Sequence, residues 1–211
     1  MSMTTMKRLL IICILGLSLF ALAGLHPARV GAAPLRQTGC TLPATVTTAD
    51  QLYDCITVAN AGSGGTITLD ADINLTDLTT SPLPQITSEI TLEGDGHTID
   101  GGWNGTPGSG MQIFSVAGTG DFTVNQATLQ HGEAANGGAI ANDTGATLTV
   151  TNSVFSNNSA NNRGGAIYSF AYEVTLTVMN STFSDNVAGG SGGAIAYYLD
   201  TPLFPITVSN S

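Results

Sequence analysis

The chain has 211 residues, of which 9% are charged and 6% aromatic, and its formal net charge is −10 at pH 7. Glycine, serine, threonine and asparagine are abundant instead, a composition typical of stacked all-β repeats. Because only five residues are Lys or Arg, the chain cannot neutralise a run of phosphates. This argues against nucleic acid as a partner and disfavours anionic polysaccharides.

The first 32 residues predict a secretory signal peptide. Lys7 and Arg8 precede an uncharged, apolar run over residues 9–25, and Val30 and Ala32 place small residues at the third and first positions before a cleavage site. An uncleaved membrane anchor is the alternative, although the apolar run is marginal in length for one.

Cleavage would change the charge and the cysteine content of the exported chain. It would leave Arg36 and Arg163 as the only Lys or Arg residues, and it would remove Cys13. Cys40 and Cys55 then remain, an even number in an exported chain, so we expect a disulfide between them. Two unpaired thiols, one of them packed under a helix, are the alternative.

Residues 33–65 are expected to form an N-terminal cap with a short helix at about 49–60. The apolar positions of this helix follow the i, i+3, i+4, i+7 spacing of one face: Leu52, Cys55, Ile56 and Ala59. Thr48 is a suitable N-cap, and the glycine-rich run 62–65 ends the helix. A solenoid needs a cap over its first open coil, and an amphipathic helix suits that role.

After the helix, short strands are predicted where apolar and polar residues alternate. In the first half of the chain these segments are 66–69, 89–92, 97–99 and 111–116. No segment after residue 62 has helical periodicity of useful length. We therefore expect residues 66–211 to form β-repeats that end within a repeat, with the less regular copies first.

The second half contains three motifs that recur in phase. Gly-Gly-Ala-Ile occurs three times, [Leu/Ile]-Thr-Val-x-Asn-Ser occurs three times, and Phe-x-x-Asn occurs twice in phase with them. Their nearly constant interval falls in the range of about 20–50 residues that is typical of solenoids. The motif positions to which we assign structural roles are Gly137, Gly138, Ile140, Gly164, Gly165, Ile167, Gly192, Gly193, Ile195, Phe155, Asn158, Phe183 and Asn186.

A solenoid stacks each residue on its counterpart in the next coil, at a spacing of about 4.8 Å. Equivalent isoleucines and phenylalanines should therefore form internal columns. Equivalent asparagines should form amide ladders at turns, where asparagine tolerates a positive φ. The predicted ladders are Asn152, Asn180 and Asn210 in one column and Asn158 and Asn186 in another. Leu129 takes the phenylalanine position in an earlier, degenerate copy.

The paired Gly-Gly-Ala-Ile and Phe-x-x-Asn motifs resemble those of the polymorphic outer membrane protein repeat family, over about residues 86–211. Members of that family are bacterial surface β-helices linked to adhesion, often as passenger parts of autotransporters. The stretch Leu92–Gly102 is similar to a coil of pectin-lyase-like β-helices. These resemblances imply a right-handed parallel β-helix, and a location at the cell surface or outer membrane.

The chain stops within a repeat, at Ser211. We expect an open strand edge there, which could pair end to end with another copy. The family's membrane barrel is not in the sequence, so membrane association would need an anchor that the sequence does not identify. A gene remnant without an independent role is a further alternative.

Polysaccharide-cleaving β-helices use acidic and basic side chains for catalysis, and this chain has only weak candidates for those roles. Arg163 is the one arginine of the repeat region, where a solvated turn residue is the simpler interpretation. Two aspartate pairs, Asp95 with Asp100 and Asp70 with Asp72, have the residue types needed for glycoside hydrolysis or calcium binding. Aspartate next to glycine in turns explains them equally well.

His97 and His131 lack the spacing of metal ligands, and we expect no catalytic residue, metal or cofactor. Several aromatic residues follow the second and third Gly-Gly-Ala-Ile motifs: Tyr168, Phe170, Tyr172, Tyr197 and Tyr198. Stacking would gather them on one side of the solenoid, as a contact for a glycan or a protein. Local packing within the loops is the alternative.

The sequence therefore favours an exported, cell-surface or outer-membrane-associated β-helix with a structural or adhesin-like role and no catalytic activity. Its expected partners are a host, cell-surface or glycan ligand. The alternative is a polysaccharide-active enzyme, either pectate-lyase-like or a glycoside hydrolase.

Overall fold

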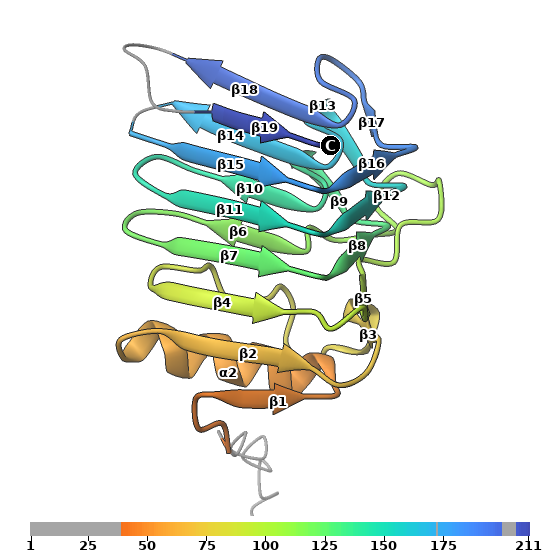
Figure 1. Ribbon diagram of the computed structural model, residues 1–211. Helices are drawn as coiled ribbons and strands as arrows, with labels where there is room; N and C mark the ends of the chain where they lie inside the picture. Colours follow the sequence, from red (N-terminus) through yellow and green to blue (C-terminus); the bar gives the residue numbers. More distant parts are fainter. Residues whose placement is uncertain (1–38, 172, 200–205) are drawn as a thin grey trace, which may run out of the picture. The chain divides into compact units, whose positions relative to one another are not determined.

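The computed structural model describes residues 39–171, 173–199 and 206–211, which belong to one compact unit, Thr38–Ser211. The strands of this unit form parallel sheets that run along a β-helix (Figure 1). The parallel β-helix predicted from the repeats is therefore confirmed. The predicted signal peptide, residues 1–32, lies outside the described residues.

Two sheets hold the strands that open each coil. Sheet A has seven described strands in the order β1 (Ala44–Val46), β2 (Gly65–Leu69), β4 (Glu89–Glu93), β7 (Asp121–Asn125), β11 (Thr147–Thr151), β15 (Thr175–Met179) and β19 (Ile206–Ser209). Sheet B has five, in the order β3 (Ile73–Asn74), β5 (Thr98–Asp100), β8 (Thr128–Gln130), β12 (Val154–Ser156) and β16 (Thr182–Ser184).

The return side of each coil forms two smaller sheets. Sheet D has three described strands, β9 (Glu133–Asn136), β13 (Ser159–Arg163) and β17 (Val187–Ala188). Sheet C has four, β6 (Phe114–Val116), β10 (Ile140–Asn142), β14 (Ile167–Ala171) and β18 (Ile195–Leu199). A regular coil thus runs from sheet A through B and D to C.

Apolar columns fill the inside of the coils, as the repeats predict. Ile167 pairs in register with Ile140 on one side and with Ile195 on the other. Phe155 lies over Phe183 with ring centroids 4.9 Å apart and an interplanar angle of 11°. Strand alternation places these residues inside, where each adds about 1.5–3 kcal/mol of burial free energy.

The asparagine ladder predicted at the turn from sheet A to sheet B is present. Asn152, Asn180 and Asn210 have φ values of 52°, 52° and 51°. The Nδ2 of Asn180 donates to Oδ1 of Asn152 at 3.5 Å, and the Nδ2 of Asn210 donates to Oδ1 of Asn180 at 3.3 Å. Asparagine suits these turns because it tolerates a left-handed backbone.

The serine after each of these asparagines forms a second ladder, which we did not predict. The Oγ of Ser153 accepts from the N–H of Ala127 at 3.2 Å and donates to the carbonyl of Thr151 at 2.8 Å. The Oγ of Ser181 likewise accepts from the N–H of Ser153 at 3.2 Å. Each hydroxyl thus satisfies a buried amide of the coil before it.

The asparagine of Phe-x-x-Asn joins neighbouring coils inside the protein. Asn158 is fully buried. Its Oδ1 accepts from the N–H of Gly132 at 2.8 Å, and its Nδ2 donates to the carbonyl of Leu129 at 3.0 Å. Asn186 repeats the contact one coil later, donating to the carbonyl of Phe155 at 2.9 Å. The motif therefore supplies backbone hydrogen bonds at a bend where the sheets provide none.

The two glycines of Gly-Gly-Ala-Ile serve different needs. Gly137 has φ 63°, in the left-handed region that favours glycine. A Cβ on Gly138 would lie 2.4 Å from the carbonyl oxygens of both Gly165 and Ser159, so the second glycine is needed for the close approach of the next coil.

The N-terminal cap contains the helix α2 (Ala49–Ala61), whose N-cap Thr48 accepts a hydrogen bond from the N–H of Gln51. This helix packs on β1, β2 and β4 at one end of the solenoid (Figure 1). A disulfide joins Cys40 to Cys55 of the helix. Strand β1, inside the segment expected to be only a cap, already pairs with β2 in sheet A.

One predicted strand is shorter than expected. Of the alternating residues 111–116, only Phe114–Val116 pair as strand β6. The preceding loop folds on itself, because the N–H of Met111 bonds to the carbonyl of Gly101 at 2.9 Å. The carboxylate of Glu133 also accepts from the N–H groups of Gly108 and Gly110, at 2.6 Å and 2.8 Å.

Candidate binding surface

Three aromatic side chains point outward from sheet C. In β14 the buried Ile167 and Ser169 face the interior, so Tyr168 and Phe170 face out. Phe170 pairs in register with Tyr198 of β18. We call Tyr168, Phe170 and Tyr198 the aromatic face.

The rings of the aromatic face form a continuous stack. The Tyr168 and Phe170 centroids are 5.9 Å apart with an interplanar angle of 24°, and the Phe170 and Tyr198 centroids are 5.7 Å apart with an angle of 21°. Phe170 is 37% exposed and Tyr198 41%, whereas Tyr168 is 7% exposed. The stack therefore leaves two of its rings partly exposed to solvent, supported by a third that is buried.

Arg163 extends this surface. Its Cζ lies 5.3 Å from the ring centroid of Tyr198, within the range of a cation–π contact. The residue ends β13, where the register with β9 shifts between Ala160 and Arg163. Such irregularities redirect side chains from the regular alternation of a strand.

Arg163 also stands out by its charge. It is the only Lys or Arg within the residues that the structure describes. No carboxylate in the described part of the chain forms an ion pair with it. Among the described residues, therefore, no anionic group competes with an external anion for the guanidinium.

A pocket adjoins the arginine and the first ring of the stack. Its lining combines amides, one cation, one ring and two glycines: Asn136, Asn161, Asn162, Arg163, Tyr168, Gly189 and Gly190. Asn161 and Asn162 are exposed. In the next coil, the N–H of Gly190 bonds to the carbonyl of Asn162 at 2.7 Å. Because Gly189 and Gly190 have no side chains, the space above the two amides stays open. We call this the asparagine pocket.

The structure divides the five aromatic residues named from the sequence. Tyr168, Phe170 and Tyr198 form the aromatic face, whereas Tyr197 follows the inward position of Ser169, with which it pairs. The Tyr197 hydroxyl is buried without a hydrogen-bond partner among the described residues, and burial raises its pKa. Tyr172 lies outside the described residues.

The asparagine pocket was not predicted as a site. Its only sequence signal is the Asn-Asn-Arg triplet before the second Gly-Gly-Ala-Ile motif. The first and third copies of the motif have no arginine before them, so the triplet breaks the repeat. That departure could have identified the pocket, because residues that structure alone requires recur in every copy.

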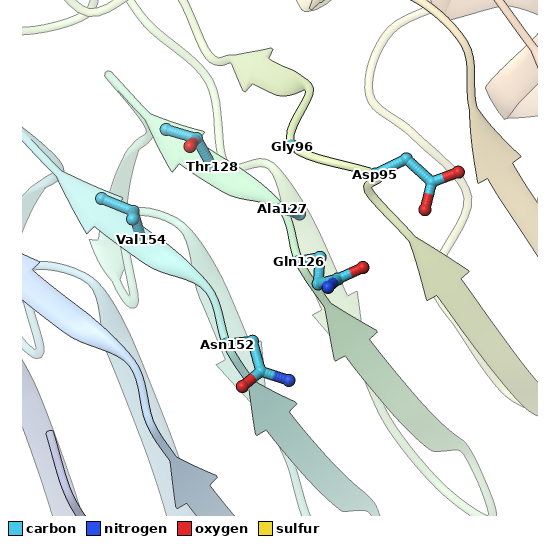
Figure 2. A pocket seen from close by; sticks show the side chains of 7 residues that line it. All are labelled: Asp95, Gly96, Gln126, Ala127, Thr128, Asn152 and Val154. Carbon is cyan, nitrogen blue, oxygen red and sulfur yellow. The ribbon is translucent and has the colours of Figure 1, made fainter.

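A second pocket lies at the turn from sheet A to sheet B. Figure 2 shows Asp95, Gln126 and Asn152 at successive turns, with Thr128 and Val154 on the adjoining strands. The three turn residues have φ values of 48°, 51° and 52°. This pocket has one carboxylate and no base, so its residues resemble the turn ladder more than a reaction site.

Two of the aspartates considered for catalysis, Asp100 and Asp72, are held in contacts between coils. Asp100 accepts from the N–H of Gly102 and from Gln130, each at 2.8 Å, and its Oδ2 lies 2.9 Å from Nδ1 of His131. Burial acts to raise the pKa of Asp100, but these hydrogen bonds outweigh burial and hold the pKa below its usual value.

Asp72 is held in the same manner. It accepts from the N–H of Thr98 at 2.9 Å and lies 3.3 Å from Nδ1 of His97. The bond from Thr98, together with His97, lowers the pKa of Asp72. Across the described ranges, no group of three or more His, Cys, Asp or Glu residues is arranged to hold a metal ion.

The fold and surface together define a repeat-built parallel β-helix with an exposed aromatic and amide surface. Residues 152–169 and 180–197 match the family model of the Chlamydia polymorphic membrane protein repeat. Both matched segments begin at a ladder asparagine and end in sheet C, so each includes one Phe-x-x-Asn and one Gly-Gly-Ala-Ile motif. Two segments of the chain are thus similar to the repeat of this family.

No curated protein and no solved structure matched the chain. Within the described residues, no helix has the length and apolar character needed to cross a membrane.

Proposed function

We propose that the protein is an exported, surface-associated β-helix that binds a ligand through the aromatic face, in an adhesin-like role without catalysis. The two repeat matches support a location at the cell surface or outer membrane, because the family they match is one of membrane proteins. The repeats themselves build the scaffold, and the residues that depart from them supply the binding surface.

The observation that carries the proposal is the exposed stack of Phe170 and Tyr198 next to Arg163. Burying aromatic area is favourable, so a protein that leaves two stacked rings in solvent has a surface suited to a partner. Tyrosine and arginine are also enriched among the residues that dominate binding energy at interfaces.

The state of Asp72 and Asp100, two of the aspartates considered for catalysis, supports a role without catalysis. Glycosidases need one carboxyl group with a raised pKa as the acid, opposite a second carboxylate. Asp72 and Asp100 instead have lowered pKa values and are engaged by hydrogen bonds from neighbouring coils. Their arrangement suits a role in holding coils together.

The binding test uses the full secreted protein, labelled and incubated with a panel of cultured cells. We expect the cells to retain much less of the double variant Phe170→Ser, Tyr198→Ser than of the unmodified protein. The control Val154→Ser with Val187→Ser removes exposed apolar side chains elsewhere, since these residues are 36% and 48% exposed. Equal retention of both double variants and the unmodified protein would refute the proposed binding surface.

Two further measurements test the location and the absence of catalysis. Protease treatment of intact producing cells should remove the protein if it is surface-exposed. Incubation with pectin, polygalacturonate and alginate, with and without calcium, should give no new chain ends. Turnover that disappears in Asp100→Asn or Arg163→Gln would establish the enzyme alternative.

A further inference from the structure

We infer that the asparagine pocket binds an oligosaccharide through the carboxylate of one acidic sugar, with Arg163 as the carboxylate-binding residue. This inference rests on the proposed function and adds the chemical class of the ligand. It follows from three groups of residues that come from two adjacent coils.

The first group is the arginine. A guanidinium stacked on a ring keeps the N–H groups of its edge free, and these groups match a carboxylate in a bidentate geometry. The Cζ of Arg163 lies 5.3 Å from the ring centroid of Tyr198, and Arg163 has no carboxylate partner among the described residues. It is thus oriented by a neighbour and still available to a ligand.

The second group is the amides. Asparagine side chains both donate and accept hydrogen bonds, as sugar hydroxyls do. No side-chain hydrogen bond joins Asn161 or Asn162 to any other residue in the described ranges. This contrasts with the asparagines of the two ladders, whose amides bind the next coil. Gly189 and Gly190 leave the approach to these amides open.

Close packing between the coils also requires glycine at positions 189 and 190. A Cβ on Gly189 would lie 2.3 Å from the carbonyl oxygen of Asn161, and one on Gly190 would lie 2.5 Å from that of Asn162. The coil above therefore cannot extend side chains from these positions without moving the backbone. The pocket is open as a consequence of how the two coils stack.

The third group is the aromatic face. Phe170 and Tyr198 are two stacked, partly exposed rings, and Arg163 lies against the second of them. A pyranose ring has one face formed largely of C–H groups, which packs on an aromatic ring while its hydroxyls reach polar neighbours. A sugar bound to Arg163 could therefore continue into a second sugar over the rings.

Charge separates the ligand classes. The chain has 15 acidic residues and a net charge of −10, so an extended polyanion meets repulsion along most of the surface. One guanidinium neutralises one carboxylate. The arrangement therefore fits an oligosaccharide with a single acidic sugar better than a polyuronate or a sulfated polymer, consistent with the composition.

The test titrates the full secreted protein with acidic and neutral saccharides by calorimetry. Sialyllactose carries one carboxylate, lactose and maltotriose carry none, and alginate is a polyanion. We expect sialyllactose to bind at least about tenfold more tightly than either neutral sugar, since a charge-assisted bidentate contact separates them. Alginate should bind no better than the neutral sugars.

Variants assign the preference to the residues. Arg163→Gln should reduce binding of sialyllactose to the neutral level, and Arg163→Lys should restore only part of it because lysine binds as a point charge. His97→Gln, on the distant sheet B side of the coil, is the matched control and should bind as the unmodified protein does. Unchanged thermal unfolding of each variant shows that the fold is retained.

Equal binding of acidic and neutral sugars, an unchanged affinity in Arg163→Gln, or absence of binding to every sugar would each overturn the inference. The proposed function fails separately. If no sugar binds but the Phe170→Ser, Tyr198→Ser variant still loses cell retention, the binding surface stands and its ligand is of another class, such as an acidic peptide.

Discussion

Replacement of Asn158 tests whether the ladder inside the coils holds the solenoid together. In Asn158→Ala the N–H of Gly132 and the carbonyl of Leu129 lose the side-chain partners that they have at 2.8 Å and 3.0 Å. Asn158 is fully buried, so water does not replace these bonds without opening the coil. At about 1–3 kcal/mol for each buried unsatisfied group, we expect a loss of about 2–4 kcal/mol in the free energy of unfolding.

The assay is urea unfolding at pH 7, followed by circular dichroism and by the fluorescence of the single tryptophan, Trp103. The matched control is Asn161→Ala, which removes an exposed amide from β13, the strand that begins directly after Asn158. It should change the free energy of unfolding by less than about 0.5 kcal/mol. If the two variants unfold at the same urea concentration, the buried ladder does not have the stabilising role that we assign to it.

Three further predictions concern charge and the cap. Because the folded pKa of Asp100 is lowered, its contribution to stability is present above the unfolded pKa and is lost as pH falls through the folded value. The free energy of unfolding, followed from pH 6 downward, should therefore fall more steeply in the unmodified protein than in Asp100→Asn. Burial, followed by the charge of Glu89, raises the pKa of Asp121. Asp121→Asn should therefore raise the midpoint of unfolding at pH 7 and leave it unchanged at pH 3. An unchanged midpoint at pH 7 would contradict this account. Replacing Cys40 and Cys55 by serine should cost about 3 kcal/mol, since the disulfide closes a short loop, and equal thermal unfolding with and without the disulfide would show that it does not stabilise the cap.

The regular half of the fold could be predicted because its information is local and repeated. Once Gly-Gly-Ala-Ile and Phe-x-x-Asn are seen to recur in phase, stacking places Ile140, Ile167 and Ile195 in one column. The serine ladder was harder to predict. A serine after a turn asparagine has many uses, and only the neighbouring coil shows that its hydroxyl accepts a buried N–H.

The first half was predicted less accurately because its copies are irregular. Met111 belongs to an alternating segment, yet it lies in a loop whose backbone bonds to itself and to Glu133. Strand β1 was assigned to the cap although it pairs with β2. A strand of three residues has too few positions for alternation to be recognised in the sequence.

The sequence by itself determined that the chain winds as a parallel solenoid, since short alternating strands recur at a constant interval with no helical segment between them. The tertiary structure decided the binding surface. Strand parity sends Tyr198 outward and its neighbour Tyr197 inward, and the irregular register of β13 places Arg163 on the ring of Tyr198 from the next coil. Contacts of this kind depend on which side of a strand faces solvent and on which residues lie one coil apart. Neither can be read from the sequence of one repeat.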